Sequence, residues 1–198
     1  MAQRALEMSA ASAIEIFTLI TGIIFILMQI VQHKWMWYFD IISGAGALLM
    51  ALLSSFWANA LLQAYFIVMA VVGMVRWRRI RNDSGEDGLH VVKLSSRTAM
   101  TSAALAIIGG AVIWWILRST SDPSPVADAA SFILSIIATW WLACAYKEEW
   151  LLWLVADGIA VWMYASQSHW GMAVLYVCYV ISCIAGFLHW KRKGKVVS

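Results

Sequence analysis

The chain has 198 residues, of which 63% are hydrophobic and 13% are charged. A soluble domain carries about 25% charged residues, so this composition excludes an ordinary soluble protein and indicates a polytopic membrane protein. The net charge is only +3, and the basic residues lie in short stretches between apolar runs, which argues against nucleic acid as a partner.

Seven apolar runs are long enough to cross a bilayer, at about 20 residues per helix. Polar stretches from Arg76 to Arg97 and from Ser119 to Pro125 isolate the fourth run. The sequence therefore predicts an all-α polytopic membrane protein with seven transmembrane helices. The predicted spans are Ser9 to Val31, Trp35 to Ser54, Trp57 to Val75, Thr98 to Leu117, Ala127 to Tyr146, Trp150 to Ala165 and Gly171 to His189.

Basic residues divide unevenly between the two sides of the predicted membrane. Placing the C-terminus inside puts twelve of them in the cytoplasm, against Arg4 and Arg118 outside. Because basic loops are retained in the cytoplasm, we expect the N-terminus outside and the C-terminus inside. The same rule explains the basic tail from Lys191 to Lys195 without a partner.

The two halves of the chain repeat without a gap. A constant offset of 113 residues relates them and places Lys34 opposite Lys147. We interpret this as a duplication, with three-helix bundles at residues 1–77 and 127–198 and a linking helix within 78–126. Because one helix separates them, both bundles run in the same direction through the membrane, with a site expected between them. The matched pairs are Glu15 with Asp128, Lys34 with Lys147, Trp37 with Trp150, Trp57 with Trp170, Gly73 with Gly186 and Trp77 with Trp190.

A carboxylate stands in the middle of the sixth predicted helix. Helical spacing places it on one stripe with three aromatic residues: Trp150, Trp153, Asp157 and Tyr164. An acid at mid-membrane costs about 2.5–3.5 kcal/mol and usually faces a bundle interior or a cavity. Indoles beside a carboxylate favour binding of a cationic aromatic ring. The alternatives are an acid that only holds helices together and, for Trp150, an anchor at the membrane interface near Lys147.

Asp40 is a second acid within an apolar run. It lies six residues after Lys34, or about 9 Å deeper along a helix. We interpret it either as a second contact to a cationic substrate or as an ion-pair partner of Lys34 or Arg76. Because Gly44 and not Asp40 coincides with Asp157 in the repeat, the site is expected to be asymmetric.

Gln63 and Tyr176 occupy equivalent positions in the two halves. Each can hydrogen-bond a substrate, and each can equally hold neighbouring helices together. Tyr176 also shares a helical stripe with Tyr179, Cys183 and Gly186, for which the alternative interpretation is close helix packing that Gly186 permits. The three cysteines, Cys183 included, fall inside apolar runs without metal-site spacing and are interpreted as packing residues.

The sequence carries no catalytic motif and no metal-ligand spacing. The four histidines are scattered along the chain, which favours neither a metal site nor a proton relay. We therefore expect no enzyme activity and no cofactor.

Several segments resemble the PnuC family of vitamin transporters, and together they cover essentially the whole chain. They are KEEWLLWLVAD, Gly186-x-x-x-Trp190, IEIFTLITG near the start, and LLQ followed by Gly73-x-x-x-Trp77. The resemblance implies a SWEET-like arrangement of two three-helix bundles joined by a linking helix, commonly trimeric, in the bacterial plasma membrane. It also implies facilitated diffusion of nicotinamide riboside, or of thiamine or other vitamins in relatives, followed by trapping through a cytoplasmic kinase.

The family's Trp-x-x-Trp-x-x-x-Asn/Asp motif falls on Trp150, Trp153 and Asp157, and its helix-three glutamine falls on Gln63. Ala70 stands where nicotinamide riboside transporters usually have Asn, and Asp157 replaces the commoner Asn, which leaves the vitamin open. We expect a uniporter for a small vitamin with a cationic aromatic ring, nicotinamide riboside first and thiamine next. The alternative from another class is a non-transporting structural or regulatory membrane protein.

Overall fold

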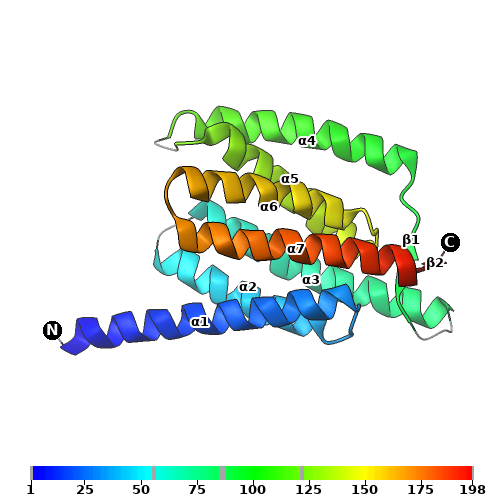
Figure 1. Ribbon diagram of the computed structural model, residues 1–198, viewed down its shortest axis with the longest axis horizontal. Coiled ribbons are helices and arrows are strands. Elements are labelled where there is room, and N and C mark those ends of the chain that lie inside the picture. Colours follow the sequence, from blue (N-terminus) through cyan, green and yellow to red (C-terminus); the bar gives the residue numbers. More distant parts are fainter. Residues whose placement is uncertain (1, 55–56, 85–87, 121–122, 198) are drawn as a thin grey trace. The chain divides into compact units, whose positions relative to one another are not determined.

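The computed structural model describes residues 2–54, 57–84, 88–120 and 123–197 (Figure 1). Within these ranges, the side chains of residues 2–12, 15, 57–58 and 83–84 are not described, so the Glu15 and Trp57 side chains of the predicted repeat lie outside the described residues. The chain divides into two compact units, Met1–Arg79 and Ile80–Ser198, and each is described by itself.

Unit 1 contains α1 (Ala2–Ile30), α2 (Met36–Leu53) and most of α3 (Trp57–Ser84). Small residues let α1 and α2 approach closely, because a Cβ added at Gly46 would overlap the Thr18 side chain. The Ser43 hydroxyl donates a hydrogen bond to the Thr18 carbonyl oxygen at 3.1 Å across the same contact. Glycine and hydroxyl residues therefore hold these two helices together.

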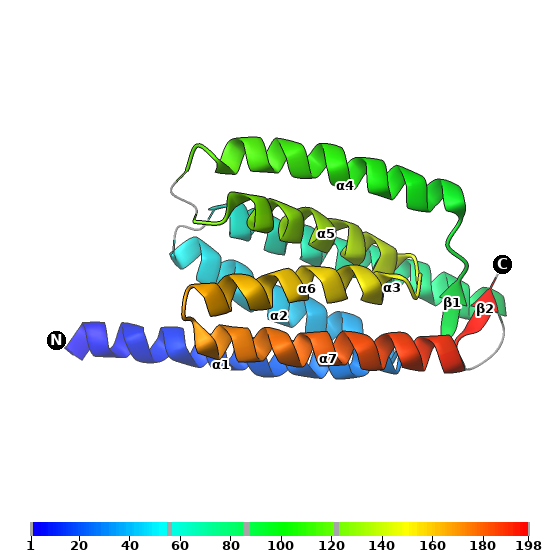
Figure 2. The same ribbon diagram turned by 45° about the horizontal axis from the view of Figure 1, so that its top comes forward.

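Unit 2 contains four helices and two short strands. In both views α4 runs along α5, and α6 packs against both α5 and α7 (Figures 1 and 2). The Ser95 hydroxyl caps α4 by accepting a hydrogen bond from Thr98 N at 3.0 Å, and Pro125 begins α5. The elements are β1 (His90–Val92), α4 (Ser96–Leu117), α5 (Pro125–Ala143), α6 (Glu149–Ser166), α7 (Trp170–Lys193) and β2 (Lys195–Val197).

Helix boundaries in the two units recur at the offset found in the sequence. The first and fifth helices end at Ile30 and Ala143, and the third and seventh begin at Trp57 and Trp170. Residues 36–53 form α2, and residues 149–166 form α6. The offset between the members of each pair is the one that relates Lys34 to Lys147.

The turns before α2 and α6 also share one backbone conformation. Gln32 and Ala145 have positive φ angles, 50° and 58°, a conformation that costs energy for residues other than glycine. His33 N donates to Met28 O at 2.9 Å, and at the equivalent positions of unit 2 Tyr146 N donates to Trp141 O at 3.1 Å. The same turn geometry therefore follows α1 and α5 in spite of different side chains.

A tryptophan–tryptophan–glycine cluster recurs in the same way. In unit 1, the Trp37 and Trp77 rings meet edge to face, with centroids 5.1 Å apart at 82°. In unit 2, the equivalent Trp150 and Trp190 rings meet at 5.6 Å and 88°. A Cβ on Gly73 or on its equivalent Gly186 would overlap the neighbouring Trp37 or Trp150 indole.

The polar stretch from Arg76 to Arg97, predicted as a loop, contains regular structure. α3 continues to Ser84, because arginine is a good helix former. β1 then pairs in parallel with β2, with Val91 opposite Val196. Lys195 N donates to Leu89 O at 2.8 Å, and Val92 N donates to Ala145 O at 2.9 Å, so residues 89–92 join the C-terminal tail to the turn before α6.

The described residues form seven α-helices, each of which contains most or all of one predicted span. Five are long and apolar enough to cross a membrane, namely α2, α3 (as Asn59–Asn82), α4, α5 and α7. The remaining two are α1, whose side chains are described as a continuous stretch only over Ile16–Ile30, and α6, whose hydropathy is lowered by Glu149 and Asp157. The first helix begins at Ala2 rather than at Ser9.

Candidate functional site

The stripe predicted on the sixth helix faces α7. Three contacts join the two helices: Trp150 with Trp190, Asp157 with Cys183, and Tyr164 with Tyr176. The residue numbers in each pair have the same sum, as expected for antiparallel helices that stay in register. Three of the four residues in the predicted stripe, Trp150, Asp157 and Tyr164, therefore lie in one seam between α6 and α7 in unit 2.

Trp150 is buried, with 2% of its surface exposed. One side of its indole lies against Gly186, where an added Cβ would come within 2.6 Å of the ring. The interpretation of Trp150 as an anchor at the membrane interface is wrong, because an anchor exposes its ring. Its Nε1 and that of the equivalent Trp37 are both buried and have no hydrogen-bond partner among the described residues.

Asp157 lies half way along α6 and is 7% exposed. The Cys183 thiol is 3.5 Å from Asp157 Oδ2, to which it donates a hydrogen bond from α7. A carboxylate has about four acceptor sites, so one weak thiol donor leaves capacity for another ligand. Cys183 therefore does more than pack, which its position within an apolar run did not suggest.

Three tyrosines gather next to this carboxylate along the same seam. The Tyr164 and Tyr176 rings are stacked, with centroids 5.3 Å apart and planes at 18°. Tyr179 meets Tyr176 edge to face at 5.6 Å. Aromatic surface on α6 and α7 thus continues the stripe past Asp157.

The other predicted site residues divide between the two units. Trp153 is half-buried on α6 and belongs to unit 2. Gln63 lies on α3 in unit 1, and its Nε2 donates to Asn59 Oδ1 at 3.3 Å within the same helix. That hydrogen bond is intrahelical and does not join neighbouring helices.

Asp40 is half-buried on α2 in unit 1. Among the residues that the structure describes, it forms no ion pair with Lys34 or Arg76. Arg78 of α3 contacts α2 through its Nη2, which donates to Tyr38 OH at 3.3 Å. The ion-pair interpretation of Asp40 therefore finds no support within unit 1.

Sequence reasoning missed two buried residues of this region. Cys183 could have been found from the antiparallel register, because aligning Trp150 with Trp190 places it opposite Asp157. Glu149 in the first turn of α6 is fully buried. Glu149 directly precedes the predicted motif, and Cys183 contacts the motif's Asp157 from α7.

Seven helices, most of them apolar enough to span a bilayer, with a carboxylate buried between two of them, define a multi-pass helical membrane protein. The family model described as nicotinamide mononucleotide transporter matches residues 12–192. The chain therefore belongs to this family, and the resemblance to PnuC transporters is confirmed.

The sequence is similar to three bacterial transporters. The nicotinamide riboside transporter PnuC of Neisseria mucosa is 20% identical over 66% of this chain and 53% of the relative. PnuC of Haemophilus influenzae is 21% identical, over 69% and 60%. The chain thus matches little more than half the length of these two. The riboflavin/roseoflavin transporter RibM of Streptomyces davaonensis is 27% identical over 89% of this chain and 83% of the relative.

A crystal structure of the vitamin B3 transporter PnuC has the same fold. Its TM-score is 0.71 at 19% identity, and the match covers 91% of this chain and 81% of that chain. The likeness therefore extends over nearly all of the helices described above.

Proposed function

We propose that this chain carries a small vitamin with an aromatic ring across the membrane by facilitated diffusion, with nicotinamide riboside as the first candidate. The observation that carries the proposal is the buried Asp157 carboxylate, which accepts one weak hydrogen bond and shares a helix stripe with half-buried Trp153. The family's description as a transporter agrees with this assignment.

The chemistry of the site suits a ring that carries a positive charge. Nicotinamide riboside contains a pyridinium ring, which stacks on an indole face and is attracted by its electrons. A carboxylate supplies the counter-charge, and the attraction increases where water is excluded. One side of Trp150 is already covered by Gly186, so we assign the stacking role to Trp153. Tyr176, Gln63 and Asp40 are proposed as further polar contacts.

For the architecture, we propose two equivalent three-helix bundles joined by α4, in the SWEET-like arrangement that the family resemblance implies. Support comes from the helix ends, the positive-φ turns and the tryptophan–glycine clusters, all of which recur at the offset of the sequence repeat. A homotrimer and a cytoplasmic kinase that traps the vitamin are proposed from the resemblance alone.

For localisation, we propose a bacterial plasma membrane with the N-terminus outside and the C-terminus in the cytoplasm. The distribution of basic residues supports this orientation, and α7 ends in Lys191, Arg192 and Lys193.

Riboflavin is a second candidate substrate, because RibM matches more of this chain than either PnuC relative does. The riboflavin ring system is larger and uncharged, so its binding would depend on stacking and hardly on Asp157. Thiamine, whose thiazolium ring is cationic, remains a third.

Uptake by purified protein in liposomes tests the proposal. Labelled nicotinamide riboside, riboflavin and thiamine are offered separately, and we expect one of them to equilibrate without an imposed gradient. Accumulation above equilibrium that requires a proton or sodium gradient would contradict facilitated diffusion. If none of the three crosses, although the protein is folded and inserted, the structural or regulatory alternative is favoured.

A further inference from the structure

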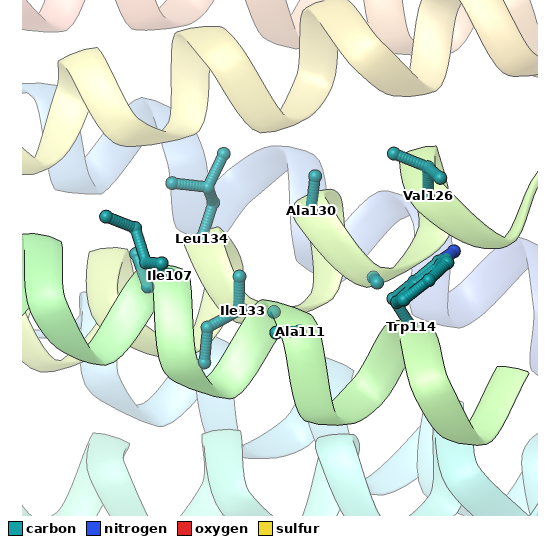
Figure 3. Close-up of a pocket in the computed structure, with 10 residues that line it drawn as sticks. Ile107, Ala111, Trp114, Val126, Ala130, Ile133 and Leu134 are labelled. Carbon is teal, nitrogen blue, oxygen red and sulfur yellow. The ribbon is translucent and has the colours of Figure 1, made fainter.

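An open apolar groove of about 400 Å³ lies between α4 and α5, away from the α6–α7 seam (Figure 3). Small residues such as Ala106, Gly110 and Ala130 line it together with larger apolar side chains, among them Ile107, Trp114 and Val126. In the close-up, the Trp114 ring stands at the end of the groove near Val126, and Ile107 lies toward the other end.

Specific contacts fix the two helices that form this groove. The Trp141 Nε1 donates a buried hydrogen bond from α5 to the Ser102 hydroxyl of α4 at 3.1 Å. A Cβ added at Gly109 would come within 2.8 Å of the Ile133 side chain, so α4 and α5 touch at this point. The groove is therefore a feature of the packed fold.

A cation stands at the Trp114 end. The Arg118 guanidinium lies 5.4 Å from the Trp114 ring centroid and 5.8 Å from that of Trp115. Among the described residues Arg118 forms no ion pair. A guanidinium that stacks on aromatic rings still has N–H groups at its edge, and these suit a phosphate.

We propose that this groove binds an acyl chain of an anionic phospholipid, whose phosphate is held by Arg118. The dimensions agree with one leaflet of the bilayer. From Ala106 to Trp114 the groove runs about 12 Å along α4, and Arg118 lies about 18 Å from Ala106. Half of a hydrocarbon core is about 15 Å. A chain lying in the groove would therefore bring its headgroup to the level of Arg118.

An apolar helix from a second copy of the chain would cover the groove without using the cation at its end. A phospholipid brings an acyl chain and a phosphate together, which matches an apolar groove that ends beside a guanidinium. The two occupants are distinguished by the experiment below.

Native mass spectrometry of the full-length protein tests the proposal, with phosphatidylglycerol and phosphatidylcholine of identical chains as probes. We expect wild type to bind phosphatidylglycerol more tightly. Arg118→Gln should reduce this preference roughly fivefold, whereas Arg118→Lys should keep most of it. Ala130→Phe fills the groove and should weaken binding of both lipids, whereas Ile108→Phe adds the same ring to an exposed position of α4 outside the groove and should not.

Two results would overturn the assignment. One is an unchanged preference for phosphatidylglycerol in Arg118→Gln together with unchanged lipid binding in Ala130→Phe. The other is efficient disulfide cross-linking between two copies that carry Ala130→Cys in a bilayer, which would identify a second copy of the chain as the occupant. Retained thermal stability of each variant confirms that the lipid result is not caused by misfolding.

Discussion

Asp157 is the residue that most directly decides which ring the proposed site accepts. If it is the counter-charge for a pyridinium, Asp157→Asn should weaken nicotinamide riboside binding by about 1–3 kcal/mol, or roughly 5- to 150-fold. Asn keeps the shape and can still accept a hydrogen bond from the Cys183 thiol. Trp153→Ala should cause a comparable loss through stacking. Isothermal titration calorimetry on the purified protein measures both.

A neutral analogue of the vitamin, with a reduced ring, is the control for charge. Its binding should respond to Trp153→Ala and hardly to Asp157→Asn. If Asp157→Asn destroys insertion or thermal stability while the remaining folded protein binds normally, Asp157 only holds α6 against α7. If riboflavin is the substrate, Trp153→Ala should weaken its binding and Asp157→Asn should hardly change it, as for the neutral analogue.

At the level of single residues, the sequence could predict which side chains of the sixth helix share a stripe, but not what that stripe faces. The stripe Trp150, Asp157 and Tyr164 follows from helical spacing. The position of this stripe against α7 depends on residues of the partner helix. Gly186 leaves room for the Trp150 ring, and the Cys183 thiol donates to the Asp157 carboxylate. One helix considered alone cannot distinguish a packing seam from a ligand site.

At the level of elements, apolar runs predicted all seven helices because each must satisfy its backbone groups internally. The two short strands could not be predicted. They depend on pairing between segments that are far apart in the chain, His90–Val92 with Lys195–Val197. The polar stretch before α4 also continues α3 as a helix to Ser84, which composition alone did not reveal.

The small sheet gives a test at the element scale. Lys195→Pro removes the N–H group that donates to Leu89 O, and should lower the free energy of unfolding by about 0.5–1.5 kcal/mol. Gly194 has the extended conformation that a residue before proline prefers. Lys195→Ala keeps the N–H and is the matched control. Thermal unfolding in detergent measures the difference, and faster amide exchange at His90–Val92 in Lys195→Pro alone locates it. Equal stability of the two variants would show that the pairing contributes nothing.

At the scale of the whole molecule, the proposed seven membrane-spanning helices would place the two ends of the chain on opposite sides of the membrane. Reporter fusions at Ser198 and within residues 84–88 should both be cytoplasmic, because the basic residues divide twelve to two. A periplasmic signal from either fusion would contradict the orientation and the parallel arrangement of the bundles.

The proposed equivalence of the two bundles predicts matched responses to matched substitutions. Gly73→Ala and Gly186→Ala each place a Cβ inside a tryptophan ring of the same unit, and each should cost about 1–3 kcal/mol of stability through overpacking. Gly158→Ala is the control, because nothing lies within 4 Å of its added Cβ, and it should stabilise α6 by about 0.5–1 kcal/mol. Trp37→Leu should relieve only Gly73→Ala, and Trp150→Leu only Gly186→Ala, in double-mutant cycles of thermal stability. If only one of the two glycine substitutions lowers stability, the tryptophan–glycine contact does not contribute equally to the two bundles. The common spacing in the sequence would then not reflect equivalent packing.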